Sequence, residues 1–119
     1  MQDLIKAMKA LSDETRLRIL NVLLERECCV CEVMQALDIS QSRASRNLGI
    51  LQEAGFLRTR RDRVWIVYFV DWQATNRYAS YLAKLLKDSP ISSEVLAQDK
   101  ERLKHAVRVG PAALRNCGA

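Results

Sequence analysis

The chain has 119 residues, of which 49% are hydrophobic and 28% are charged, and this balance predicts one soluble domain with a modest core. Its longest apolar run, residues 64–70, is too short to cross a bilayer, and the N-terminal segment does not resemble a secretory signal. We therefore expect a cytoplasmic protein, and the formal net charge of +5 permits a polyanionic partner without proving one.

Three short helices are predicted in the N-terminal third of the chain. Apolar residues three and four positions apart predict an amphipathic helix over residues 2–11. Leucines on one face predict a second helix over residues 17–26, and Ser12 and Asp13 can accept hydrogen bonds from free N–H groups at its start. A third and shorter helix is expected over residues 32–38.

A fourth helix is predicted over residues 40–57, with Ser40 as its N-cap and Gly55 at its closing end. The side of this helix that faces away from its apolar stripe begins with five polar or cationic residues, Gln41, Ser42, Arg43, Ser45 and Arg46. A helix that enters a DNA groove places its base-reading side chains in its first turns. A short helix, a three-residue turn and a second helix of this kind predict a helix-turn-helix.

Two strands joined near Asp62 are predicted next, over residues 56–60 and 64–70, because β-branched and aromatic residues dominate the second of them. The hexamer RTRRDR at residues 58–63, which covers the end of the first strand and the connection, is basic and contains Arg58, Arg60, Arg61 and Arg63. Alone, such a hexamer is most simply a solvated loop. Directly after a helix-turn-helix, a basic hairpin is a wing that can hold phosphate, so Arg60, Arg61 and Arg63 are assigned to DNA contact.

Two further helices are predicted in the C-terminal third of the chain. Residues 72–87 present an apolar face and predict a fifth helix, and residues 92–107 predict a sixth helix of weaker periodicity. The expected fold class is therefore mainly α with a small β-hairpin, a winged helix-turn-helix of five to six helices.

Three segments resemble signature motifs of the ArsR/SmtB family of small winged-helix repressors. They are ALSDETRLRIL at residues 10–20, the cysteine-containing box at residues 27–33, and SQSRASRNLGILQEAG at residues 40–55. The resemblance extends from residue 3 to residue 86. It implies a homodimer that represses an operon by binding double-stranded operator DNA until a metal or metalloid releases it.

The resemblance also implies a division of the chain and a dimer interface. Residues 1–88 are expected to form a winged helix-turn-helix DNA-binding and dimerisation domain, and residues 89–119 a C-terminal extension with a weak helix and a mobile tail. The dimer is expected to form through the helices near residues 3–11 and 72–87. No membrane partner is expected.

The cysteine-containing box holds three of the four cysteines, Cys28, Cys29 and Cys31. Thiolates are soft ligands that suit arsenic(III), cadmium, lead and copper(I). In the arsenic-responsive branch of the family two cysteines separated by a valine supply sulfur ligands, and the resemblance places them at Cys29 and Cys31. Side chains two positions apart share a face of an extended chain but not of a helix. Both sulfurs can therefore reach one atom only where the backbone is not regularly helical. Binding there would distort the helix-turn-helix.

A third donor is less clearly marked. Arsenic(III) prefers three thiolates, and Met34 occupies the position of the family's usual third cysteine. Cys28 and Cys117 are the remaining candidate ligands, although Cys28 stands where the family commonly has leucine and Cys117 lies in the tail. Neighbouring residues of an extended segment face opposite ways, so Cys28 joins Cys29 only where the backbone is irregular. A two-sulfur site completed by a non-protein ligand is an open alternative.

The sequence thus predicts a metalloid-responsive repressor without a permanent cofactor, released when arsenic(III), as arsenite, or antimony(III) binds cysteine thiolates. The same repressor sensing cadmium or lead, or sensing thiol oxidants and sulfur species through low-pKa cysteines near Arg26, is an open alternative. An enzyme is disfavoured, because the pattern predicts no βαβ unit of the kind that carries the cysteines of thiol oxidoreductases, and the single histidine, His105, is remote from the cysteines. A winged helix that binds protein instead of DNA is disfavoured by Arg43 and Arg46.

Overall fold

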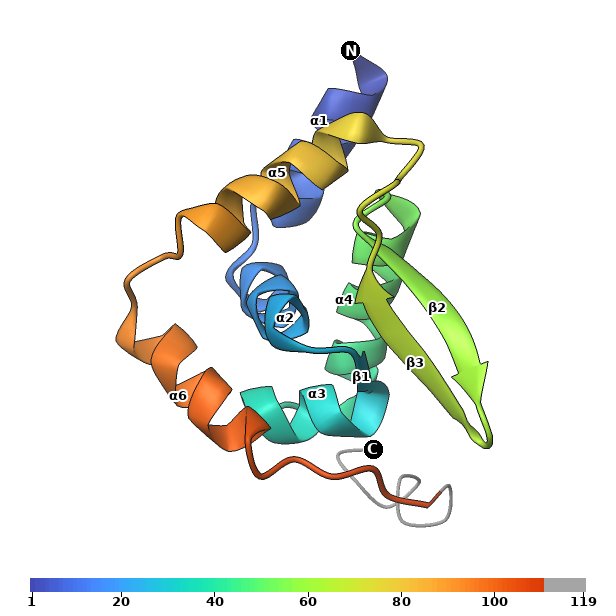
Figure 1. Cartoon of the computed structure of the whole chain (residues 1–119), viewed down its shortest axis with the longest axis vertical. Helices are drawn as coiled ribbons and strands as arrows, with labels where there is room; N and C mark the ends of the chain where they lie inside the picture. The colour runs from blue at the N-terminus through green and yellow to red at the C-terminus, as the bar shows by residue number, and fades with distance from the viewer. Residues whose placement is uncertain (111–119) are drawn as a thin grey trace.

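The computed structural model describes residues 1–110, and Figure 1 shows how they are arranged. The elements of this part of the chain are α1 (Gln2–Leu11), α2 (Glu14–Glu25), β1 (Cys28–Cys29), α3 (Val30–Leu37), α4 (Gln41–Glu53), β2 (Leu57–Asp62), β3 (Trp65–Val70), α5 (Arg77–Asp88) and α6 (Glu94–Leu103). The predicted fold class is confirmed, and the β2–β3 hairpin projects beside α4 as a wing. Within residues 1–110, every helix is too short or too polar to cross a membrane.

Side-chain caps fix where the helices of the helix-turn-helix region begin. The Asp13 carboxylate accepts a hydrogen bond from the Arg16 N–H at 3.0 Å before α2, and the Ser40 hydroxyl accepts one from the Arg43 N–H at 3.2 Å before α4. Each cap satisfies a backbone donor that has no partner inside its helix. Asp38 adopts a left-handed φ of 56° and ends α3, so a three-residue turn connects α3 to α4 as predicted.

Two predicted helix boundaries are wrong because the terminating residues act at other positions than the apolar pattern indicates. α3 begins directly after Cys29, which serves as its N-cap, and therefore before the predicted start at residue 32. α4 ends at Glu53, because Gly55 has a positive φ of 98° that breaks the helix. A Cβ atom at Gly55 would also lie 2.9 Å from the Asn76 Cβ atom, so the close approach of these segments requires glycine.

The fifth helix begins later than predicted. α5 starts after Asn76 instead of at residue 72, because the Asn76 side chain accepts a hydrogen bond from the Tyr78 N–H at 3.2 Å. The amide nitrogen of the same side chain donates to the carbonyls of Asp3 and Ala54, at 2.9 and 3.0 Å. One asparagine therefore ties α5 to the start of α1 and the end of α4.

The three strands form one antiparallel sheet in the order β1-β3-β2. β2 and β3 are the predicted hairpin, whereas β1 was not predicted and consists of two cysteines. Cys28 lies opposite Tyr68 and Cys29 lies opposite Val67, both on β3. The cysteine segment is therefore hydrogen-bonded to the sheet of the wing.

The sixth helix packs against α2 and α3, away from the wing in Figure 1. It is shorter than the predicted residues 92–107, because Ser93 caps its N-terminus and it ends at Leu103. Asp99 on this helix is fully buried and accepts two hydrogen bonds from Arg18, at 2.8 Å each, and one from Arg102 at 2.8 Å. The buried ion pairs hold α6 against the central helix α2, which contacts every other helix.

Candidate functional site

The first turns of α4 carry the side chains predicted to contact DNA. Four of them, Ser42, Arg43, Ser45 and Arg46, are exposed and Gln41 is half-buried. The Arg43 guanidinium donates to the Thr15 hydroxyl at 2.9 Å, which ties this arginine to the start of α2. Within residues 1–110, Arg46 makes no side-chain hydrogen bond or ion pair. Its guanidinium is therefore the one best placed on this surface to reach an external acceptor.

The wing carries the second group of predicted contacts, and Arg58, Arg60, Arg61 and Arg63 are all exposed on it. Arg60 pairs with Glu27 at the end of the cysteine-bearing loop, and the Arg61 Nε atom donates to the Arg63 carbonyl at 3.3 Å. Asp62, the one acid of this segment, pairs with Arg108 at 2.6 Å, and this bond lowers the pKa of Asp62. Because Arg108 neutralises the Asp62 carboxylate, the arginines of the hairpin tip keep a net positive charge, which favours contact with phosphate.

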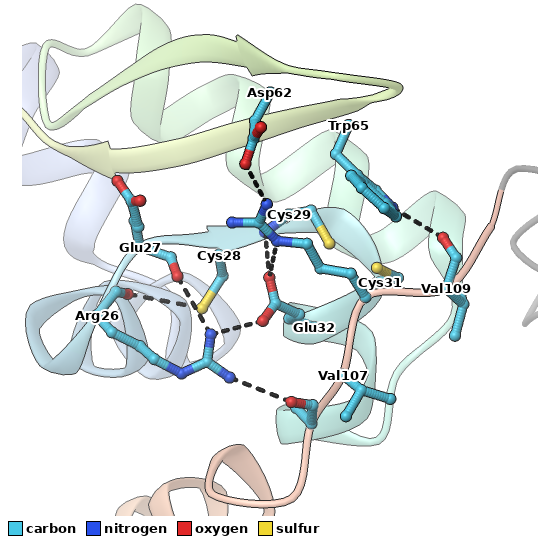
Figure 2. Close-up of polar contacts among 12 residues, drawn as sticks. Arg26, Glu27, Cys28, Cys29, Cys31, Glu32, Asp62, Trp65, Val107 and Val109 are labelled. Carbon is cyan, nitrogen blue, oxygen red and sulfur yellow. Dashed lines mark hydrogen bonds and ion pairs between the residues drawn. The ribbon is translucent and has the colours of Figure 1, made fainter.

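The side chains of Cys29 and Cys31 lie near each other at the start of α3 (Figure 2). Cys29 precedes the helix with an extended φ of −82° and ψ of 171°, and Cys31 lies in the first turn. The backbone between them is therefore not regularly helical. Figure 2 shows the two sulfurs close together beneath Trp65. Both residues are buried, at 3% and 2% exposure.

Cys28 points away from this pair. Its thiol donates to the Arg26 carbonyl at 3.6 Å, on the opposite side of β1 from the Cys29 sulfur (Figure 2). Its side chain is fully buried and belongs to the apolar core. The alternation expected of neighbouring residues in an extended segment is thus observed, and it separates Cys28 from Cys29 and Cys31.

Burial controls the chemistry of these thiols. It raises the pKa of Cys28 to about 12, outweighing the opposite effect of Arg26. Burial also raises the pKa of Cys29, and the contact with Cys31 adds to that shift. The prediction of low-pKa thiols near Arg26 is therefore wrong for Cys28 and Cys29. Desolvation of Cys28 disfavours the thiolate more than Arg26 stabilises it, and at Cys29 desolvation is again the largest effect. An ion that binds these sulfurs must displace protons.

Glu32 organises the same site and was not predicted as a functional residue. Its Oε1 atom accepts from the Cys29 N–H at 2.9 Å and from Arg108 at 3.3 Å, and its Oε2 atom accepts from Arg26 at 2.5 Å (Figure 2). Burial alone would raise the pKa of Glu32, but the bonds from Cys29 and Arg26 hold it below its ordinary value. The signal in the sequence was the spacing of Cys29 and Glu32, which is that of a capping box.

A third protein donor is not found beside the cysteine pair in the described region. Among residues 1–110, no group of three or more His, Cys, Asp or Glu side chains could hold a metal ion. Cys117 lies outside the described residues. Cys31 and Met34 line a surface groove of about 450 Å³ that Ile39 and Val109 also border, and Cys31 contributes little exposed surface to it, at 2% exposure.

An exposed apolar surface lies on α1 and α5, which pack against each other. Ile5 and Met8 on α1 are 40% and 55% exposed, and Tyr81 and Leu85 on α5 are 65% and 56% exposed. Together they cover the surface at which dimerisation was predicted.

Comparison with known proteins matches residues 13–59 to the family described as bacterial regulatory protein, arsR family. The matched segment contains α2, the cysteine segment, α3 and α4. The chain is 48% identical over 61 residues to the arsenic resistance transcriptional regulator ArsR1 of Pseudomonas putida, which covers 50% of this chain and 48% of that protein. It is 40% identical over 70 residues to a cadmium resistance regulatory protein CadC homolog of Staphylococcus aureus, covering 58% of each.

A second regulator of Pseudomonas putida, arsenic resistance transcriptional regulator ArsR2, aligns over more of its length. It is 37% identical over 98 residues, which cover 82% of this chain and 83% of that protein. The chain thus spans about half the length of some curated relatives and most of another. Among solved structures, the transcriptional repressor BigR of Xylella fastidiosa superimposes with a TM-score of 0.60 at 30% identity, covering 77% of this chain and 90% of that one.

Proposed function

The chain belongs to the arsR family of bacterial regulatory proteins, and from this premise we propose that it is a repressor that arsenic(III) releases from operator DNA. The family is one of transcriptional regulators and not of enzymes. The observation that carries the proposal is the placement of the Cys29 and Cys31 side chains near each other at the start of α3, the helix that packs against α4. Soft thiolates at this position place the inducer beside the DNA-reading helix.

DNA contact is assigned to α4 and the wing. The first turns of α4 enter the major groove, where Gln41, Ser42, Arg43, Ser45 and Arg46 meet base edges and nearby phosphates. The wing arginines Arg60, Arg61 and Arg63 hold the phosphate backbone. Their exposure and the absence of any described side-chain partner for Arg46 within residues 1–110 support this assignment.

Release follows from the position of the two sulfurs. Arsenic(III) that bonds both sulfurs displaces their protons and constrains a residue that now caps α3 and one inside its first turn. The Cys29 N–H also bonds Glu32, so the constraint reaches the capping box. α3 packs against α4 and is joined to it by a three-residue turn. A change at the start of α3 therefore alters how α4 is presented to DNA.

The third bond of the arsenic atom is assigned to Cys117 or to a small non-protein ligand. Cys28 is a weaker candidate, because its sulfur lies on the opposite face of β1 and reaches the pair only if β1 leaves β3. Met34 lines the groove next to Cys31, but its thioether is neutral and binds less strongly than a thiolate.

The repressor acts as a homodimer in this proposal. The apolar surface of α1 and α5 provides the contact, because Met8 and Tyr81 expose more than half of their area in the single chain. A two-fold dimer presents two copies of α4 to half-sites about one helical turn apart, roughly 34–36 Å. The operator is then an imperfect palindrome.

A second candidate function keeps the repressor and changes its signal. The similarity to a cadmium resistance regulatory protein supports cadmium as the signal for this candidate. Lead is grouped with cadmium, because both ions bind thiolates. Antimony(III) has the same preference as arsenic(III) and is grouped with the leading proposal. Oxidants and sulfur species are less well supported, because burial raises the pKa values of Cys28 and Cys29.

The test is fluorescence anisotropy of a labelled duplex from the promoter upstream of the gene, titrated with the reduced protein. Arsenite should raise the Kd of the native chain at least about 10-fold, within the usual range of allosteric coupling. Cys29→Ser and Cys31→Ser should abolish the effect, and Cys28→Ser, whose sulfur faces away, is the matched control. Release by cadmium or lead alone would select the second candidate, and a native Kd unchanged by any of these ions would refute metal sensing.

The assignment of the DNA contacts is tested in the same assay without inducer. Arg46→Ala should reduce the preference for operator over random duplex by about 1–3 kcal/mol, because a base contact is lost. Arg61→Ala should weaken both duplexes alike and reduce the slope of log Kd against log salt by about one. An equal loss on both duplexes for Arg46→Ala would remove it from the base-reading set.

A further inference from the structure

After α6 the chain runs back across α3 toward the wing, and we call residues 104–110 the C-terminal strap. The Val107 N–H donates to the Gln35 side chain at 3.0 Å, and the Gln35 amide nitrogen donates to the Val107 carbonyl at 2.7 Å. Farther along, the Trp65 indole N–H donates to the Val109 carbonyl at 2.8 Å (Figure 2). The strap is therefore fixed to α3 at one point and to the wing at another.

Arg108 lies between these two anchor points and bridges two carboxylates. Its Nε atom donates to Glu32 Oε1 at 3.3 Å, and its Nη1 atom donates to Asp62 Oδ2 at 2.6 Å. The guanidinium also lies 5.7 Å from the centre of the Trp65 ring. Glu32 belongs to α3, whereas Asp62 and Trp65 belong to the wing strands. This one side chain therefore links α3 to the wing.

The bridge depends on a property of the guanidinium group that an ammonium group lacks. A guanidinium presents several donors in a fixed plane, so it holds two carboxylates in a defined relative position, whereas an ammonium is a point charge on a flexible stem. The Arg108 side chain is only 26% exposed and the Glu32 side chain 6%, which limits screening by solvent. A shift of Glu32 is therefore transmitted to Asp62.

We infer that Arg108 is the positioning residue that couples the cysteine pair to the wing. Glu32 bonds the Cys29 N–H on one side and Arg108 on the other, so an ion that constrains Cys29 moves the same carboxylate that holds the wing. This inference rests on the proposed release of DNA by an ion at Cys29 and Cys31. It adds a second route to release, through the wing, beside the route through α3 and α4.

The first experiment measures the coupling factor, the ratio of the operator Kd with saturating arsenite to the Kd without it. Arg108→Lys keeps the net charge and removes the planar guanidinium, so the ratio should fall at least about two-fold toward 1 while the arsenite affinity of the free protein stays within about two-fold. Asp62→Asn, made from the wing side, should reproduce the fall. Lys104→Ala is the matched control, since Lys104 lies on the strap and pairs only with exposed Glu101 within residues 1–110.

The second experiment needs no inducer and reads the wing itself by hydrogen exchange of the β2 and β3 amides. Glu32→Gln should accelerate that exchange several-fold in the native background and add little in an Arg108→Ala background, because its effect passes through Arg108. Additive effects of the two substitutions would overturn the inference.

The outcomes separate the inference from the function on which it rests. A native chain that keeps its DNA in arsenite refutes the proposed inducer, while the exchange experiment still decides the coupling through Arg108. A native coupling factor retained in both Arg108→Lys and Asp62→Asn overturns the inference and leaves the proposed function standing. An equal loss of DNA affinity with and without arsenite would make Arg108 a phosphate contact and also overturn it.

Discussion

The buried Asp99 offers a direct test of how α6 is held in the fold, through the substitution Asp99→Asn. The carboxylate is fully buried and accepts three hydrogen bonds at 2.8 Å from Arg18 and Arg102. The amide keeps the shape but loses the charge, and it brings an NH₂ group against two guanidinium groups. Removing one partner of a buried ion pair costs about 3–5 kcal/mol. Because the side chains of Arg18 and Arg102 are 17% and 39% exposed, water stabilises part of the freed charge, and we expect a loss of about 2–3 kcal/mol.

The loss is measured by urea unfolding at one fixed protein concentration, because the proposed dimerisation would contribute to stability. Asp88→Asn is the matched control: it makes the same chemical change in the Lys84–Asp88 pair, whose side chains are 64% and 57% exposed, and should cost less than about 0.5 kcal/mol. The Arg18 guanidinium also donates to the Leu37 carbonyl at 3.1 Å, at the end of α3, so operator binding should weaken in parallel. A difference below about 1 kcal/mol between the two variants would refute the ion-pair anchoring of α6.

Three further outcomes are expected from the structure. Gly55→Ala should lower stability by about 1–3 kcal/mol in thermal unfolding, because φ is 98° and the new Cβ would meet Asn76 at 2.9 Å. Gly49→Ala, in open space inside α4, should raise stability by up to about 1 kcal/mol. Equal effects of the two substitutions would contradict the strain at Gly55. The pKa of Glu32 is lowered in the folded protein, so its stabilising contribution is present above about pH 4.3 and is lost as the pH falls through its folded-state pKa. The Tm of the native protein should therefore fall more steeply below pH 5 than the Tm of Glu32→Gln. Parallel curves of Tm against pH would refute this contribution of Glu32. Iodoacetamide should alkylate Cys28 far more slowly in the folded than in the unfolded chain at pH 8, as peptide mass spectrometry can show, and equal rates would contradict its burial and its pKa of about 12.

The elements that the sequence predicted correctly are those with local signals. The caps at Asp13 and Ser40 lie next to periodic apolar runs, and both form the predicted hydrogen bonds. The wing combines β-branched residues with a short polar connection, which also acts over a few residues. For the cysteines, the period-two alternation of an extended chain correctly placed Cys28 opposite Cys29.

The features that the sequence did not reveal depend on contacts between distant residues. Arg18 and Asp99 are 81 positions apart, and Arg108 and Glu32 are 76 apart, so no local spacing indicates that they meet. The later start of α5 depends on Asn76 bonding to the carbonyl of Asp3 across the fold. The pKa values of the thiols were misjudged for the same reason, since burial arises from packing of segments that are separate in the chain.

The burial of the two sulfurs also has a consequence in time. Cys29 and Cys31 are 3% and 2% exposed, so an inducer reaches them only when the start of α3 or the strap opens locally. Under the proposed function, the response rate at low arsenite would follow the concentration, and at high arsenite it would reach a ceiling set by the opening rate of the protein. A brief pulse that ends before opening would then leave the operon repressed, whereas a sustained exposure would not. In the proposed sensor, burial thus selects for the duration of a signal as well as for its chemical identity.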